Sequence, residues 1–194
     1  FSMENQGYQP SINLHYHLEM GASKADLERI GASQNPPRTL PEAAYNFQAT
    51  GCIFDGFPPF SDAYFGLCSV LGSPKDFYTL TYNALRNAHK RGISLFEVIA
   101  SPDLAIQYQI DWKQMLHEVD AAITMVQHEC PLKAEALLTF IKGAAPSQGQ
   151  KASEQIEYLV RQQQAGRLKN FRGVHLSGAE VASEDYTQFV PAYD

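Results

Sequence analysis

Residues 12–18, Ile-Asn-Leu-His-Tyr-His-Leu, carry two histidines with one residue between them. Side chains alternate along a strand, so a strand here places His15 and His17 on one face and the apolar side chains on the other. Two imidazoles arranged in this way can bind one metal ion, and imidazole suits zinc, copper, iron and nickel. The alternative is a histidine pair on a half-exposed strand without a metal. The rest of the chain favours the metal hypothesis.

Short apolar strands alternate with amphipathic helices along the chain. We expect strands at 12–18, 93–99, 134–141 and 171–176. We expect helices from Ser23 to Gly31, over 62–71, from Ser73 to Gly92, after Asp111 and over 152–166, with serine, proline and aspartate marking their starts. Strands separated by long helical crossovers indicate βαβ units and a parallel sheet.

The expected strands end in residues that could form a site. They run into His17-Leu18-Glu19, Ala100-Ser101-Pro102 and Ser177-Gly178-Ala179-Glu180. In a (β/α)₈ barrel the chemistry lies at the carboxyl ends of the strands, and such a barrel needs about 250 residues. The predicted fold class is therefore α/β, a partial (β/α)₈ TIM barrel of roughly the first four βα units. We expect residues 1–194 to be the amino-terminal half of a metal-dependent hydrolase barrel, incomplete as given.

Three segments carry a resemblance to a known family. Residues 13–19, NLHYHLE, resemble an opening strand L-H-x-H-L-[DE]. Residues 73–77, SPKDF, followed by residues 92–98, GISLFEV, resemble a second βα unit, and residues 173–180, GVHLSGAE, resemble G-[IV]-D-L-x-G-x-E. In this order and spacing the chain resembles the zinc-dependent adenosine/AMP deaminases of the amidohydrolase superfamily, over the amino-terminal half of their barrel.

The resemblance implies a Zn²⁺ cofactor held in part by His15 and His17. Catalytic zinc usually has three or more protein ligands, and these two histidines supply only two. The resemblance implies that the remaining ligands and the catalytic acid and base belong to strands five to eight. We therefore expect no catalytic acid or base in this chain and place these groups beyond Asp194.

The resemblance also implies four substrate-binding residues. Glu19 matches an acidic residue that hydrogen-bonds the sugar or fills the equivalent space in base deaminases; otherwise it is a solvated loop acid or a charge at the entry of a helix. Gly178 would bring a backbone N–H close to the purine, or it is a turn glycine. Phe60 and Tyr64 would contact the ligand from a helix that covers the pocket, although residues spaced i, i+4 are more often core.

The chain departs from the family pattern at three positions. Met20 stands where a glycine is usual, Ile99 where relatives often carry arginine, and His175 where aspartate is common. These departures leave the exact purine open. We expect His175 to be structural: it could point inward, but a role as ligand is not expected. The remaining histidines are expected at the surface: His89, His117 and His128.

Composition excludes several classes of function. The 194 residues are 44% hydrophobic and 19% charged with a net charge of −6, so the chain is neither disordered nor fibrous. Without a dense Lys/Arg stripe, we expect no nucleic-acid partner and no anionic membrane. No apolar run reaches transmembrane length, and a cytoplasmic location is expected. Cys52, Cys68 and Cys130 are read as reduced thiols, and the absence of C-x-x-C disfavours a cytidine-deaminase-type zinc site.

The main functional hypothesis is hydrolytic deamination of a purine nucleoside or base. It requires the missing carboxyl-terminal half-barrel as a partner, in cis or as a second chain. A four-strand open parallel sheet leaves two unpaired edges, so the isolated half is expected to self-associate. The alternatives are an inactive deaminase-like remnant that acts as a binding or assembly module, and another amidohydrolase.

Overall fold

The computed structural model describes residues 11–42, 44, 55–141 and 148–177. Their four strands are parallel and lie in the order β1-β2-β3-β4. The strands are β1 (Ser11–His17), β2 (Ile93–Ala100), β3 (Lys133–Ile141) and β4 (Phe171–Ser177). Each lies within one residue of its predicted bounds, and the simple sequential order is the one that repeated βαβ units produce.

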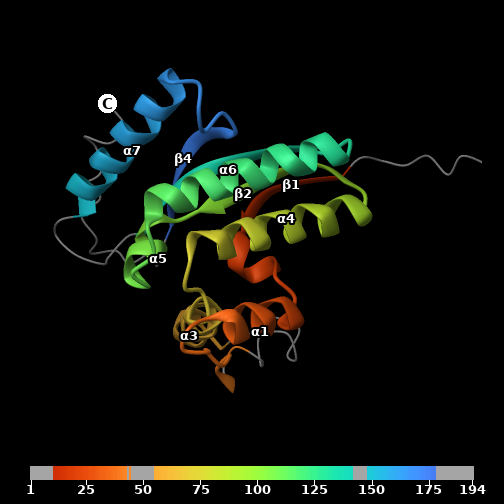
Figure 1. Cartoon of the computed structure of the whole chain (residues 1–194), viewed down its shortest axis with the longest axis vertical. Helices are drawn as coiled ribbons and strands as arrows, with labels where there is room; N and C mark the ends of the chain where they lie inside the picture. Colours follow the sequence, from red (N-terminus) through yellow and green to blue (C-terminus); the bar gives the residue numbers. More distant parts are fainter. Residues whose placement is uncertain (1–10, 43, 45–54, 142–147, 178–194) are drawn as a thin grey trace, which may run out of the picture.

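Helices cover the sheet and extend beyond one end of it (Figure 1). The 3₁₀ helix is η1 (Leu18–Gly21), and the α-helices are α1 (Lys24–Ser33), α3 (Phe57–Cys68), α4 (Pro74–Lys90), α5 (Pro102–Gln107), α6 (Trp112–Glu129) and α7 (Gln148–Gln164). Figure 1 shows α4 and α6 side by side along the sheet, while α1 and α3 lie together beyond the end of β1. This arrangement brings α3 next to η1, directly after β1.

Three helices differ from the sequence prediction in their bounds, among them α7, which spans Gln148–Gln164 instead of 152–166. α1 does not stop at Gly31 but continues to Ser33, and a Cβ at Gly31 would collide with the carbonyl oxygen of Arg38. The glycine is therefore there for a close approach between backbones rather than to end the helix. α3 spans Phe57–Cys68 instead of 62–71.

The short helix α5 was not predicted. Ser101-Pro102 was interpreted only as the end of β2, but the Ser101 hydroxyl accepts a hydrogen bond from the Leu104 amide at 3.3 Å and Pro102 occupies the first helical turn. Both are ordinary features of a helix start. The half-buried Asp103 of α5 accepts hydrogen bonds from the Ile141 amide at 3.0 Å and from Gln155 Nε2 at 3.2 Å, which ties α5 to β3 and α7.

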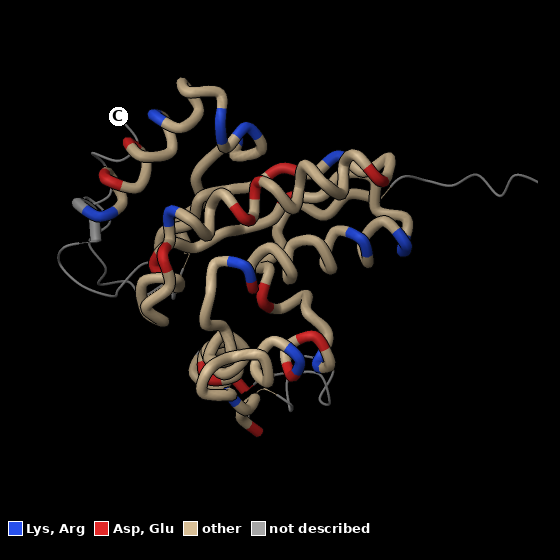
Figure 2. Tube along the Cα trace, in the orientation of Figure 1, with Lys and Arg blue, Asp and Glu red and all other residues tan. Residues whose placement is uncertain are grey.

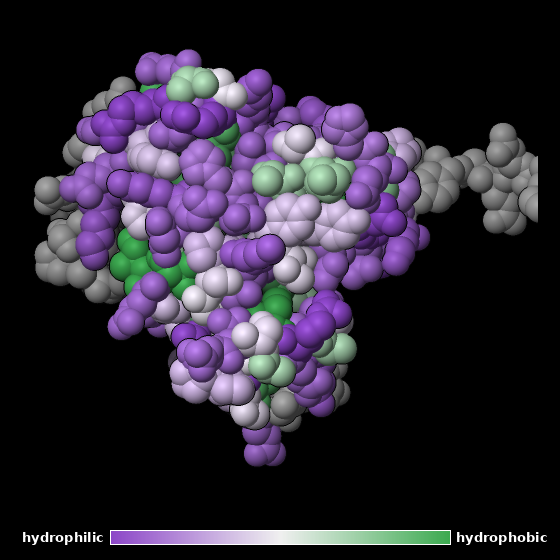
Figure 3. All heavy atoms as spheres, viewed as in Figure 1, coloured by the Kyte–Doolittle hydropathy of each residue, from purple (hydrophilic) through white to green (hydrophobic). Residues whose placement is uncertain are grey.

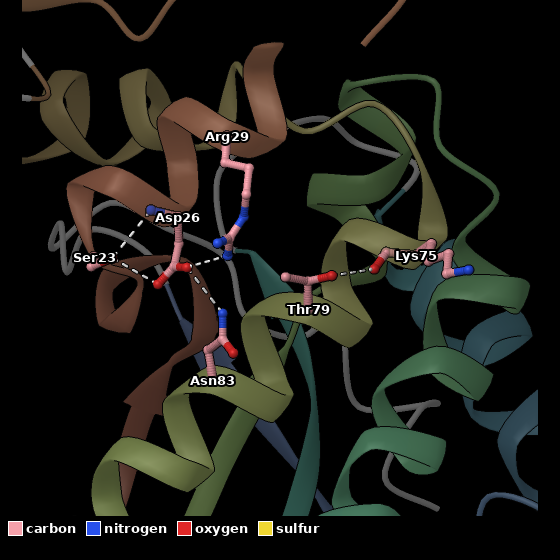
Figure 4. A network of polar contacts seen from close by, with 6 residues as sticks. All are labelled: Ser23, Asp26, Arg29, Lys75, Thr79 and Asn83. Atoms are coloured by element: carbon pink, nitrogen blue, oxygen red, sulfur yellow. Dashed lines mark hydrogen bonds and ion pairs between the residues drawn. The ribbon is translucent and has the colours of Figure 1, made fainter. Parts of the chain in front are cut away.

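The predicted helix starts at Ser23, Ser73 and Asp111 are confirmed. The Ser23 hydroxyl accepts from the Asp26 amide at 3.1 Å, and Asp111 accepts from the Lys113 amide at 3.0 Å. Figure 4 shows that the carboxylate of Asp26 also accepts a hydrogen bond from Asn83 of α4 at 3.1 Å. The cap of α1 is thereby fastened to α4, which holds the segment that follows β1 in place.

The core lies between the sheet and the helices, and it contains four phenylalanines that are at most 1% exposed: Phe77, Phe96, Phe140 and Phe171. Acidic and basic residues are interspersed along the described trace (Figure 2), without a one-sided basic stripe there. The face in Figure 3 is mostly hydrophilic, with a hydrophobic area over α5, where Ile106 is 40% exposed. Among the described residues, no helix is both long enough and apolar enough to cross a membrane.

Candidate metal centre and substrate pocket

His15 and His17 project from the same face of β1, as the alternation predicts. Their ring centroids are 5.2 Å apart, with the planes at 67°. Tyr16, between them, points the other way and packs edge-on against Phe96 at 4.7 Å. The strand thus separates a core-facing aromatic from a pair of imidazoles near its carboxyl end.

A third imidazole joins this pair. The ring of His175 on β4 lies 5.0 Å from the ring of His15, with the planes at 76°. Strands are spaced about 4.8 Å apart, so β1 and β4 would be about 14 Å apart in a flat sheet. The contact shows that the sheet curls, with the His15 and His175 side chains meeting across its concave face. The expectation that His175 is only structural therefore missed its place in this histidine cluster, which comprises His15, His17 and His175.

The environment keeps the His17 ring neutral. Burial, followed by the nearby His15 and His175, lowers the pKa of this ring from 6.5 to about 4. Only the neutral imidazole has a lone pair that can bind a metal ion. The chemistry of the donor set therefore fits Zn²⁺, because neutral imidazole is one of its standard ligands.

The histidine cluster is not closed around a single point. Within residues 11–42, 44, 55–141 and 148–177, no three His, Cys, Asp or Glu side chains are arranged to hold a metal ion as they stand. The ring nitrogens are atoms that zinc binds, but they do not surround a common point as a zinc site requires.

Glu19 lies in η1, two residues after His17, and is only 2% exposed. Burial raises the pKa of its carboxyl group to about 7. One carboxyl oxygen accepts a hydrogen bond from the Tyr64 hydroxyl at 3.3 Å. Glu19 is therefore not a solvated loop acid; it is a buried group held by α3.

Tyr64 connects Glu19 to the histidine cluster. Its ring lies edge-on to His17 at 5.8 Å and is stacked with Phe60 at 6.3 Å. Both aromatic residues are half-buried and pack against the core. The predicted pocket residues Phe60, Tyr64 and Glu19 are thus brought together beside the histidine pair.

Cys68 is a further residue at this site that sequence reasoning did not single out. It is fully buried at the end of α3, and burial together with the neighbouring Glu19 raises the pKa of its thiol well above the usual value. Its spacing of one helical turn from Tyr64 was the available signal, since residues at i and i+4 share a helix face.

Two other predicted features lie near the site or outside the described residues. Ile99, at the position where arginine is common, pairs with His17 across the sheet and is 1% exposed, so the chain packs an apolar side chain there. Gly178 lies outside the described residues.

His117 is not simply at the surface, because it is half-buried with Nε2 3.1 Å from the Tyr158 hydroxyl.

A shallow hollow of about 420 Å³ lies elsewhere, near the end of α6 and the start of β4. Its lining includes Asp120 and Asn170, and the Asn170 amide donates to the Asp120 carboxylate at 2.8 Å. This is the amino-terminal side of the sheet, where residues of such folds serve stability rather than chemistry.

The fold and the site define a class of protein: half of a (β/α)₈ barrel with imidazoles at the carboxyl ends of its strands. The family model described as adenosine deaminase matches residues 10–194. The chain therefore belongs to the adenosine deaminase family, and the resemblance noted in the sequence is confirmed.

Individual relatives agree with this assignment. The chain is 26% identical over 133 residues to an adenine deaminase of Bordetella avium, covering 69% of this chain and 42% of that protein. It superposes on the adenine deaminase of Arthrobacter aurescens with a TM-score of 0.77 and 19% identity, over 95% of this chain and 53% of that one. The chain thus spans about half the length of these relatives, and the predicted partial barrel is confirmed.

One similar structure contains zinc. It is an amidohydrolase from Burkholderia ambifaria with bound Zn, and it superposes with a TM-score of 0.66 and 14% identity over 96% of this chain and 48% of that one. At this identity the similarity establishes the shared fold.

Proposed function

We propose that this chain is the amino-terminal half of a zinc-dependent aminohydrolase that deaminates adenine or a closely related purine. The observation that carries the proposal is the geometry after β1: a neutral, paired imidazole at His17 directly beside the buried Glu19–Tyr64 pair. These groups lie at the carboxyl end of a strand, where barrels of this kind place their chemistry.

In this proposal His15 and His17 bind the metal through neutral imidazole nitrogens. A bound zinc ion supplies Lewis-acid chemistry that activates water at neutral pH. The rings of Phe60 and Tyr64 would form an apolar wall against the purine and exclude bulk water. The group that protonates the purine ring is assigned to the other half of the barrel.

The state of Glu19 favours a free base over a nucleoside as substrate. An acid that binds a sugar hydroxyl must be open to the ligand, whereas Glu19 is 2% exposed and already bonded to Tyr64. In this proposal its side chain would fill the space that a sugar needs in a nucleoside deaminase. The adenine deaminases among the relatives support the same choice.

The proposal includes a second half-barrel, from the same polypeptide or from another chain. The chain spans about half of its relatives, and among the described strands β1 and β4 each have an unpaired edge. Mass spectrometry of the natural protein tests this part. A native product of 194 residues that deaminates purines without a partner would contradict it.

The activity is tested on the zinc-loaded natural protein by measuring ammonia release from adenine, adenosine and AMP. We expect adenine to give the highest kcat/KM. His17→Ala should abolish turnover, and His128→Ala, which changes an exposed histidine on α6, should leave it unchanged. Absence of turnover with all three purines would support an inactive binding module instead.

A further inference from the structure

We propose that the outer face of α4 and α6 is an interface between two copies of this chain. The two helices lie side by side along the sheet (Figure 1). In a (β/α)₈ barrel the helices form the outer ring, so a second half-barrel that joins the edges of the sheet leaves this face uncovered. The inference is therefore independent of the proposed function.

The face consists of two rows of side chains with identical spacing. Each row has residues at i, i+3, i+7 and i+11, which lie on one side of a helix. The row on α4 comprises Lys75, Tyr78, Tyr82 and Arg86. The row on α6 comprises Glu118, Ala121, Met125 and Glu129. No member of either row is buried, so both rows are open to a partner.

Contacts within the chain set the two rows level with each other. Glu129 accepts hydrogen bonds from the Tyr82 hydroxyl and from Arg86, each at 2.8 Å. The helices α4 and α6 lead into the neighbouring parallel strands β2 and β3, so they run in the same direction. With Arg86 beside Glu129, the equal spacing places Lys75 level with Glu118.

The middle of this face has the composition of an interface, and its ends are charged. The rings of Tyr78 and Tyr82 are stacked at 6.1 Å, and Met125 in the other row is 45% exposed. Figure 3 shows a hydrophobic strip over α6 beside weakly polar surface over α4. Tyrosine, methionine and arginine are enriched in interfaces, which combine an apolar centre with a polar rim. A helix that faces only water is polar on that side.

Charge complementarity identifies a second copy as the occupant. The row on α4 has a basic residue at each end, and the row on α6 has an acidic residue at each end. A twofold axis parallel to the helices places the α4 row of one copy on the α6 row of the other, in the same direction and register. Lys75 then meets Glu118 of the second copy, and Tyr82 meets Met125 of the second copy, a favourable sulfur–aromatic pair.

The size of the face predicts a reversible dimer. The helices have 17 and 18 residues. At about 1.5 Å per residue and about 10 Å per helix diameter, the face covers on the order of 500 Å² per copy. A standard stable interface has roughly 800 Å² per partner. We therefore expect a dimer that dissociates on dilution.

The test reverses the charge at Lys75 or at Glu118. All chains carry Leu14→Lys, so that pairing through the edge of β1 does not contribute, and this chain without further changes is the reference. Sedimentation velocity over a series of concentrations at low salt measures dimer dissociation. Lys75→Glu alone and Glu118→Lys alone should each raise the dissociation constant about tenfold, because both symmetric contacts then join like charges.

An equimolar mixture of the two variants gives the sharpest readout. In the heterodimer each introduced charge meets an opposite charge, so the mixture should associate as tightly as the reference chain. A loss of folding in either variant would not be repaired by mixing. Lys75 lies in the first turn of α4, where a carboxylate is favourable, and circular dichroism checks the fold of both variants.

Lys151→Glu is the matched control, since it makes the same charge change at an exposed position of α7 and should leave association unchanged. Three results would overturn the proposal: a monomeric reference chain, association that neither reversal weakens, or a mixture that remains dissociated. Weakening by each reversal and recovery in the mixture support it. These readouts involve neither metal nor purine, so failure here leaves the proposed function standing.

Discussion

The hydroxyl of Tyr64 donates a hydrogen bond of 3.3 Å to the buried carboxyl group of Glu19, joining α3 to the segment that follows β1. The two residues are 45 positions apart in the sequence. Through this contact α3 is fastened to the segment that follows the strand carrying the histidine pair. Its strength can be compared with a second Tyr–Glu pair at the surface.

Tyr64→Phe should lower the free energy of unfolding by about 1–3 kcal/mol, because it leaves a buried acceptor without its donor. Tyr82→Phe is the matched control: Tyr82 donates to Glu129 at 2.8 Å, but Arg86 also bonds that carboxylate and the pair is exposed. The control should cost less than about 1 kcal/mol. Urea unfolding of the metal-free chain measures both, and equal losses would contradict the buried role of Tyr64.

The pKa of Glu19 predicts how stability depends on pH. Folding raises this pKa from an ordinary 4.5 to about 7, so the folded chain binds the proton more tightly than the unfolded chain. The stabilising contribution is fully present below pH 4.5 and is lost as pH rises through 7. Glu19→Gln should remove this decline and stabilise the chain at pH 8 by on the order of 2–3 kcal/mol.

Urea unfolding of the metal-free parent and of Glu19→Gln at pH 5 and pH 8 gives the comparison. The amide keeps the size of the side chain and an oxygen for the Tyr64 hydroxyl. If the free energy of unfolding changes by the same amount between pH 5 and pH 8 in the parent and in Glu19→Gln, Glu19 does not titrate with a raised pKa.

Asp103 should make the main polar contacts that hold helix α5 against β3 and α7. Asp103→Ala removes the acceptor for the Ile141 amide and for Gln155, whose side chain is 2% exposed. The expected loss is about 1–3 kcal/mol, because two donors in a partly buried setting lose their partner. Asp62→Ala, at an exposed position of α3, should change stability by less than about 0.5 kcal/mol. Thermal unfolding of the two variants decides the point.

The 194-residue chain by itself should self-associate. β1 is an edge strand among those described, and Ile12 and Leu14 on it are 60% and 56% exposed. Unpaired edges with exposed apolar side chains favour pairing between chains. Leu14→Lys should reduce association, whereas Val160→Lys, at a 42% exposed position on α7, should not. Size-exclusion chromatography with light scattering provides the measurement, and a monomeric parent would contradict the prediction.

Much of the fold could be predicted because its signals are local. Ser73 and Asp111 cap free amides at helix starts, and Pro74 has no amide to leave free, whatever the rest of the chain does. Strand positions followed from short apolar runs bounded by turns. Gly31 misled the prediction because a glycine needed for close packing looks the same as one that ends a helix.

The candidate site, too, could be predicted only where its signals are local. Alternation along a strand was enough to place His15 and His17 on one face, because that depends only on backbone geometry. The burial of Glu19 by Tyr64 and the meeting of His15 with His175 depend on where α3 packs and on how far the sheet curls. These are properties of the assembled tertiary structure, in which residues 45 or more positions apart come into contact, and no local pattern encodes them.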